Sequence, residues 1–176
     1  LLADPETINA FALPGGQIFV TAGLYKRLRT EADLAGVLGH EIGHVIHRHS
    51  AEQMAKGQLG QALSQAVGVA ASDGADGGQQ AAMMAAMVNH MVQMRYGRQD
   101  ESESDRYGLD AMAAAGYDPR AMLEVMKVLA QAGGGERQPE WLSSHPLPET
   151  RIAEIEAYIR QMPAPSAPVS EGRPLS

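Results

Sequence analysis

One stretch, residues 30–49, reads TEADLAGVLGHEIGHVIHRH and predicts the central helix of the fold. Thr30 with Asp33 three positions later resembles a capping box, in which side chains satisfy free backbone N–H groups of the first helical turn. Apolar residues then recur at the spacing of one helical face: Leu34, Val37 and Leu38. We therefore expect a helix from about residue 31 to about residue 49.

The rest of the chain favours packed helices with few strands. Hydrophobic residues make up 44% of the sequence and aromatic residues only 5%, so the core must consist mainly of Ala, Leu, Val and Met. Strand signals are confined to residues 10–13 and 17–21, which flank a Pro-Gly-Gly turn as a hairpin would. Further helices are expected at about residues 51–71, 79–95, 99–115, 120–132 and 149–161. The predicted fold class is mainly α with a small N-terminal β-hairpin.

Length, charge and cysteine content exclude several classes of function. The chain has 176 residues, the size of one ordinary domain, and no apolar run reaches the roughly 18 residues of a membrane span. Its formal net charge of −7 argues against nucleic-acid binding, which needs clustered Lys and Arg. The absence of Cys excludes disulfides, iron–sulfur clusters, Cys-type zinc fingers and thiol catalysis. Any metal must therefore bind to His, Asp or Glu.

An H-E-x-x-H motif, residues 40–44, lies within the predicted central helix. At about 100° per residue, His40 and His44 lie about 40° apart around the helix and one turn apart along it, so both rings can bind one metal ion. Glu41 lies about 60° from His44, beside that face, where a carboxylate can deprotonate a metal-bound water. The alternative is two unrelated histidines and an ordinary helical glutamate.

A third metal ligand must come from elsewhere, because a catalytic zinc usually has three protein ligands. The metzincin position, six residues after the second His, is Ser50, which excludes that class. His49 is off by one, and a continuing helix would carry it away from the metal. In the acidic run 100–105, Glu101 and Asp105 share a helix face, so one can bind the metal while the other orients a ligand histidine. The alternative is an acidic helix start stabilised by the helix dipole.

Six segments, in this order, resemble a known family: NAFALPGG (9–16), IFVT (18–21), HEIGH (40–44), ESESD (101–105), GYDP (116–119) and SHPLPETR (144–151). The chain is similar to the gluzincin-type zinc metallopeptidases that include HtpX, the CAAX prenyl proteases and the BepA-type enzymes. The resemblance covers the chain to about residue 160 and implies a zincin-like metalloprotease catalytic domain. The membrane-spanning segments of the first two branches are absent, which favours the periplasmic, BepA-like branch.

The resemblance also implies a set of site residues. The zinc ligands would be His40, His44 and Glu101, with one Zn²⁺ per chain, Glu41 as general base and Asp105 hydrogen-bonded behind the ligands. Ser104 departs from the family's usual Ala without disturbing a proposed ligand.

The loop at residues 144–151 should lie near the metal in the BepA-like branch. His145 and Arg151 are therefore candidates for stabilising the oxyanion, which the motifs leave without a partner. His145 could instead bind the zinc and close its open position. The alternative for both residues is a Pro-rich turn that caps the last helix.

The expected function is that of a zinc endopeptidase. Zinc would lower the pKa of its bound water towards ~7 and polarise the scissile carbonyl, while Glu41 moves the proton to the leaving amine. The resemblance implies polypeptide substrates, namely unfolded or misassembled envelope proteins, and a periplasmic or cell-envelope location in protein quality control. A second hypothesis is a chaperone-like or binding module whose zinc site is plugged by His145, and a third is a helical interaction protein with an accidental motif. Substrate preference and oligomeric state stay open.

The remaining expectations concern the ends of the chain and weaker features. The predicted catalytic domain covers residues 1–162, followed by a Pro-rich, disordered tail over residues 163–176, and the Leu at position 1 suggests a piece of a longer precursor. The strand at residues 17–21 either pairs with an extended substrate or is purely structural. A methionine stripe, Met84, Met87, Met91 and Met94, is expected in the core or on a substrate surface. Solvated or packed side chains are expected for His47, His49 and His90, and a surface charge for Glu103.

Overall fold

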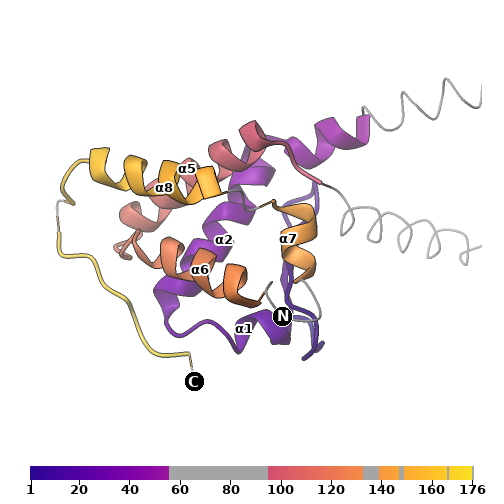
Figure 1. The fold of residues 1–176 in the computed structure, drawn as a ribbon, viewed down its shortest axis with the longest axis horizontal. Helices are drawn as coiled ribbons and strands as arrows, with labels where there is room; N and C mark the ends of the chain where they lie inside the picture. The colour runs from indigo at the N-terminus through magenta and orange to yellow at the C-terminus, as the bar shows by residue number, and fades with distance from the viewer. Residues whose placement is uncertain (56–94, 133–138, 147–148, 166, 176) are drawn as a thin grey trace, which may run out of the picture.

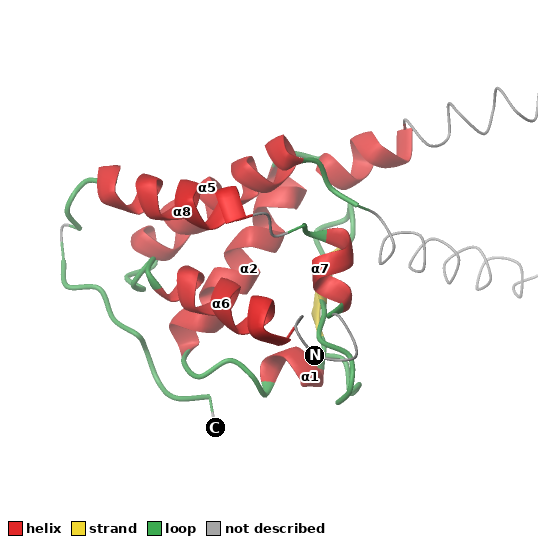
Figure 2. Cartoon of the chain, viewed as in Figure 1, coloured by secondary structure: helices red, strands yellow, loops and turns green. Residues whose placement is uncertain are grey.

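The computed structural model describes residues 1–55, 95–132, 139–146, 149–165 and 167–175. Its elements are, in chain order, β1 (Ala10–Ala12), β2 (Ile18–Val20), α1 (Ala22–Tyr25), α2 (Glu31–Ile46), α5 (Arg98–Ala114), α6 (Ala121–Ala132), α7 (Glu140–Ser144) and α8 (Glu149–Gln161). Residues 49–55 are helical as well. Helices dominate, with one two-stranded sheet at the edge (Figure 2), so the predicted fold class is confirmed.

Helix α2 runs through the middle of the described structure, with α5 and α6 packed against it and the hairpin and α7 at one end (Figure 1). Its start is as predicted: the Thr30 side chain accepts a hydrogen bond from the backbone N–H of Asp33. The core around α2 is aliphatic and rich in methionine, as the composition predicts. Its largest fully buried apolar side chains are Leu24, Leu109, Met112, Met122, Met126 and Leu129.

Glycines let α2 and α5 approach each other closely. A Cβ added to Gly43 would lie 2.7 Å from Cα of Ser104, and a Cβ added to Gly39 would lie 3.0 Å from Cα of Gly108. Small residues at two successive turns of α2 therefore face small residues on α5. This close approach brings the H-E-x-x-H motif next to the acidic run at the start of α5.

Helix α2 ends three residues earlier than the sequence predicts. It stops at Ile46, and the turn that follows places Arg48 at φ 61°, in the left-handed region. That backbone conformation costs a non-glycine residue about 1–2 kcal/mol, and no glycine at this position signals it in the sequence. The turn brings Nδ1 of His49 within 3.0 Å of Nδ1 of His44, so the expectation that His49 is carried away from the site is wrong.

The hairpin is antiparallel, with Ala10 opposite Val20 and Ala12 opposite Ile18. Its strands are shorter than predicted, but a hydrogen bond from the Leu13 N–H to the Gln17 carbonyl continues the pairing towards the turn. On the other side of β2, the Leu2 N–H donates to the Val20 carbonyl at 2.8 Å, so this end of the strand already has a backbone partner.

The C-terminal segment, expected to be disordered, lies along the start of α2 and the loop before α6. Proline lacks an N–H, but the residues between the prolines donate: Ser170 to the Gly116 carbonyl and Leu175 to the Arg29 carbonyl. Arg173 also pairs with Glu31 at 2.6 Å. The division of the chain at residue 162 stays a prediction.

Two short helices were not expected, and some expectations cannot be compared with the structure. Thr21 caps α1, and α7 replaces part of a predicted loop.

The methionine stripe, His90 and most of the helices expected at about 51–71 and 79–95 lie outside the described residues. Within the described ranges, no helix is long and apolar enough to cross a membrane.

We predict that Gly43→Ala destabilises the metal-free protein, because the new methyl group would overlap the backbone of Ser104 on α5. Overpacking of this kind costs about 1–3 kcal/mol. Gly36→Ala is the matched control on the same helix, since its Cβ would meet Met122 at an ordinary 3.4 Å. Urea unfolding followed by circular dichroism should show Gly43→Ala to be the less stable variant, and equal midpoints would contradict the close approach of α2 and α5.

Candidate metal centre

Four side chains from α2, from α5 and from the residue that follows α7 converge at one point: His40, His44, Glu101 and His145. Each offers one ligand atom, and these atoms all lie within 4.8 Å of one another. Nε2 of His40 is 3.0 Å from Nε2 of His44 and 3.2 Å from Nδ1 of His145. Oxygens of Glu101 lie 3.4 Å from His44 Nε2 and 3.0 Å from His145 Nδ1. All four residues are buried.

This geometry fits a zinc ion. Zinc–nitrogen bonds of 2.0–2.1 Å in tetrahedral geometry place neighbouring ligand atoms about 3.3 Å apart. Five distances between ligand atoms of different side chains, including 3.6 Å from His40 Nε2 to Glu101 Oε2, scatter around that value. Imidazole nitrogen and carboxylate oxygen are also ligand types that zinc prefers. The predicted ligands His40, His44 and Glu101 thus lie together, and His145 takes the fourth corner.

Asp105 orients His40 from behind. Its Oδ1 lies 2.8 Å from Nδ1 of His40, so Nδ1–H donates to the carboxylate and Nε2 keeps the lone pair that faces the other ligands. This is the position that the family resemblance implies for Asp105, whereas the spacing alone left open which of the two acids would take it.

Arg151 pairs with both buried carboxylates of α5. Its Nε and Nη2 donate to Asp105 at 2.7 and 2.8 Å, and its Nη1 pairs with Glu101. Nη1 also donates to the Pro146 carbonyl at 3.2 Å, which ties the loop after α7 to the site. With these donors engaged, Arg151 holds the acids and the loop in place in this structure instead of presenting a donor to a substrate oxygen.

The buried charges shift the pKa values of the site in different directions. Burial lowers the pKa of His44 to about 2, so this imidazole is neutral at physiological pH. Burial also lowers the pKa of His40, but the hydrogen bond to Asp105 and the nearby carboxylates outweigh it, so the net shift is upward. Burial raises the pKa of Glu101, yet the charges of His145 and Arg151 bring it well below its ordinary value. Glu101 is therefore a carboxylate.

Glu41 lies beside the ligands, as the helical spacing predicts. It is 1% exposed, and its Oε1 is 3.6 Å from Nε2 of His145 and 3.4 Å from the indole N–H of Trp141. Trp141 stacks on the His145 ring, with centroids 4.6 Å apart and planes at 19°. Helix α7, which the sequence did not reveal, thus positions both Trp141 and the loop histidine.

Sequence reasoning missed three side chains around His44. Nδ1 of His49 lies 3.0 Å from Nδ1 of His44, and its other nitrogen, Nε2, lies 3.3 Å from Oε2 of Glu103. Tyr96 stacks on the His44 ring at 3.9 Å between centroids, and its hydroxyl is 2.7 Å from Ser50 Oγ. The turn at Arg48 returns His49 to the site, and this turn has no signal in the sequence. His49 is packed, as one of the two expectations had it. Glu103 is 39% exposed, in line with the expected surface charge, and is also hydrogen-bonded to His49.

Each of the two candidate ligand histidines of α2 therefore has its own hydrogen-bonding partner at Nδ1, the ring nitrogen that faces away from the cluster. The two partners differ. His40 faces the carboxylate of Asp105, which fixes its tautomer and raises its pKa. His44 faces His49, another imidazole, which can either accept or donate a hydrogen bond. The first arrangement permits one tautomer, whereas the second permits two.

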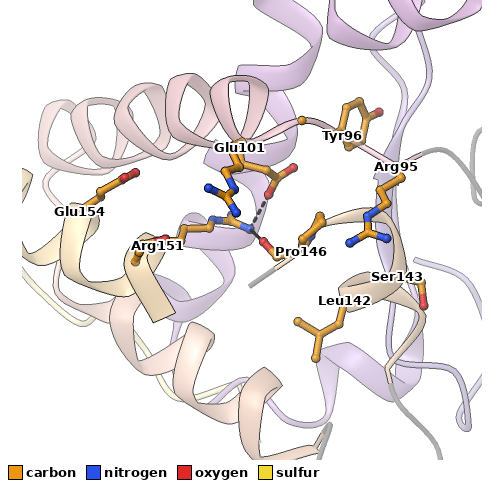
Figure 3. A pocket seen from close by; sticks show the side chains of 11 residues that line it. Arg95, Tyr96, Glu101, Leu142, Ser143, Pro146, Arg151 and Glu154 are labelled. Atoms are coloured by element: carbon orange, nitrogen blue, oxygen red, sulfur yellow. Dashed lines mark hydrogen bonds and ion pairs between the residues drawn. The ribbon is translucent and has the colours of Figure 1, made fainter. Parts of the chain in front are cut away.

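A cavity of about 720 Å³ adjoins the site (Figure 3). Glu101 and Arg151 form its inner wall, so it reaches the metal-ligand cluster. Leu142 and Pro146 supply apolar surface, and Arg95 lies at the side nearest α7. The cavity is large enough for several atoms of a peptide to approach the cluster.

The sequence profile of peptidase family M48 matches residues 1–159. The chain belongs to this family. The match covers the hairpin, the H-E-x-x-H motif, the acidic run and most of α8. The family resemblance seen in the sequence is thereby confirmed.

Individual relatives of this M48 domain include bacterial and mitochondrial proteases. The Escherichia coli beta-barrel assembly-enhancing protease is 36% identical over 92% of the chain, and the mitochondrial metalloendopeptidase OMA1 of Arabidopsis thaliana is 35% identical over 83%. Human OMA1 is 29% identical over 91%. The chain spans about a third of the length of these relatives, 34%, 28% and 32% respectively. Membership of a peptidase family whose members are in general zinc-dependent confirms the predicted class, a zinc metalloendopeptidase.

We predict that zinc affinity falls by about tenfold for each pH unit below the pKa of His40, as one proton competes for this ligand. That pKa lies above its ordinary 6.5, so the fall begins above pH 6.5, whereas His44, with a pKa of about 2, adds no further proton between pH 5 and 8. Competition with a fluorescent chelator across this range measures the slope. In Asp105→Asn, which removes the charge that raises this pKa, the onset should move to lower pH. A slope of two protons would contradict the difference between the two histidines.

Proposed function

We propose that this M48 domain hydrolyses peptide bonds with one zinc ion held by His40, His44 and Glu101. The single observation that carries the proposal is the convergence of these three side chains, with Glu41 buried beside them. Zinc bound there lowers the pKa of a water molecule towards ~7 and polarises the carbonyl of the scissile bond.

Glu41 is the general base in this proposal. Its carboxylate takes a proton from the attacking water and later delivers it to the nitrogen of the leaving amine. The indole N–H of Trp141, 3.4 Å from Oε1, helps to hold the carboxylate towards the ligand cluster. Asp105 keeps the lone pair of His40 Nε2 directed at the cluster throughout.

His145 decides whether a substrate has access. In this structure its Nδ1 occupies the corner of the ligand cluster that a substrate carbonyl or a water would need. For hydrolysis the loop must move His145 away, and its Nε2, 3.6 Å from Glu41, is then free to donate to a developing oxyanion. Besides the contacts of His145 itself, the loop is held by the hydrogen bond from Arg151 to the Pro146 carbonyl.

A second candidate function follows from the same observation. If His145 stays in place, the domain is a latent module that binds polypeptides without cleaving them. The 1% exposure of His145 and its stacking on Trp141 favour this closed arrangement.

The substrates are polypeptides, and we infer that they are unfolded or misassembled proteins of the cell envelope. Support comes from the relatives named beta-barrel assembly-enhancing proteases in Escherichia coli and Vibrio cholerae. A periplasmic or envelope location rests on the same relatives, whereas the OMA1 relatives are mitochondrial.

Glu41→Gln should reduce hydrolysis of an unfolded protein by about 10²- to 10⁴-fold, the usual contribution of a general base. Zinc content after loading with one equivalent should stay at one per chain, because the substitution changes a side chain that is not a proposed ligand. Glu124→Gln, on the exposed side of α6, is the matched control and should cleave at the wild-type rate. Cleavage by Glu41→Gln at that same rate would refute the role of Glu41, and loss of zinc from it would make Glu41 a ligand.

His145→Ala separates the two candidate functions. If the histidine blocks the site, the variant should hydrolyse the unfolded protein faster than the wild type at equal zinc content. If His145 instead assists the oxyanion, hydrolysis should fall while peptide binding is unchanged. An unaltered rate would remove His145 from both roles.

A further inference from the structure

A second group of metal-binding side chains lies on the Nδ1 side of His44. His47, His49 and Glu103 each place one ligand atom within 4.8 Å of the other two. They come from the turn after α2, from the helix at residues 49–55 and from α5. None of the three takes part in the proposed hydrolysis, and His49 links this second cluster to the first through His44.

The geometry of the second cluster suits a divalent transition-metal ion. Nδ1 of His47 donates to the Gly43 carbonyl at 2.9 Å, so its Nε2 keeps a lone pair. Nε2 of His49 lies 3.3 Å from Oε2 of Glu103. Two imidazole nitrogens and a carboxylate oxygen form a typical ligand set for zinc and its neighbours in the periodic table.

The second cluster is charged and open to solvent at His47 and Glu103. The Glu103 side chain is 39% exposed, so an ion can reach it from outside, while the His49 side chain is 4% exposed. Gln99 Nε2 donates to Oε1 of Glu103 at 2.9 Å, and Oε2 faces His49. A second carboxylate, that of Asp100, lies 3.9 Å from His49 Nε2.

We propose that His47, His49 and Glu103 form a second, inhibitory site for Zn²⁺ or a similar divalent ion, and that an ion bound there weakens zinc binding at His44. Binding of the second ion stands on the cluster alone, whereas the inhibition rests on the proposed function of the first site.

The coupling follows from the 3.0 Å contact between the two Nδ1 atoms of His44 and His49. One of these nitrogens must carry a proton and the other must accept it. Zinc on Nε2 of His44 requires the proton on His44 Nδ1, and the proton of His49 then lies on its Nε2, directed at Glu103. An ion on Nε2 of His49 requires the opposite tautomer of both rings. With both ions bound, two N–H groups would face each other across 3.0 Å, so each ion opposes the other.

Metal counting tests the site. Wild-type protein dialysed against excess Zn²⁺ should hold two zinc ions per chain, and His47→Ala and Glu103→Gln should each hold one. Glu124→Gln, an exposed carboxylate on another helix, is the control and should hold two. One zinc in the wild type, or two in both cluster variants, would overturn the proposal.

Isotope exchange tests the coupling without any need for catalysis. Protein loaded with one equivalent of ⁶⁷Zn is mixed with increasing natural Zn²⁺, and the release of ⁶⁷Zn is followed by mass spectrometry. In the wild type the release rate should rise at least about fivefold, the lower end of typical coupling between sites, and then saturate. In His47→Ala it should not depend on free zinc. A wild-type rate that is equally independent of free zinc would overturn the coupling.

Hydrolysis of the unfolded protein completes the test. Excess zinc should inhibit the wild type, while His47→Ala should match it at one equivalent and resist inhibition above that. If the wild type binds the second ion and keeps its rate, the inhibitory role is wrong. If neither protein cleaves at one equivalent, the proposed function fails, and the metal count and the exchange rate still decide the second site.

Discussion

The close packing of α2 against α5 is the constraint on which the rest of the structure depends. Gly39 and Gly43 face Gly108 and Ser104 at distances that leave no room for a larger side chain at either glycine of α2. This contact sets the separation between the two histidines of α2 and the carboxylates of α5. A helix pair held apart by ordinary side chains would be about 8–10 Å between axes, and the ligand atoms could not converge to about 3 Å. The glycines around the motif are thus part of the site, although they take no part in its chemistry.

The charged and polar side chains of the site are buried, and each such group needs a hydrogen-bonding or oppositely charged partner. Arg151 is buried between Asp105 and Glu101, and replacing the arginine alone would leave both carboxylates without this counter-charge, a change that costs about 3–5 kcal/mol in buried pairs. The same guanidinium binds the Pro146 carbonyl, so the electrostatic balance of α5 also fixes the loop that carries His145. Access to the metal site and the pairing of its acids therefore depend on one side chain.

Much of the site could be predicted from local sequence patterns, because those patterns lie on single helices. Residues 40–44 place two imidazoles on one face by helical geometry alone, and residues 101–105 do the same for two carboxylates. Both helices formed close to the expected bounds, so the predicted residues met. His49 was misjudged because the argument assumed an unbroken helix, and the left-handed turn at Arg48 is favoured by the contacts it creates, not by the residue that adopts it.

The sequence by itself determined the helical class, the identity of the metal-binding residue types and the family, since composition, periodicity and motif order are properties of the chain. Only the tertiary structure decided which histidines lie behind the ligands, that α7 places His145 at the fourth corner, and that the Pro-rich segment lies along α2. These features depend on contacts between residues that are far apart in the sequence, such as the 105 positions between His40 and His145. Helical periodicity describes neighbours within one or two turns, and it carries no information about such pairs.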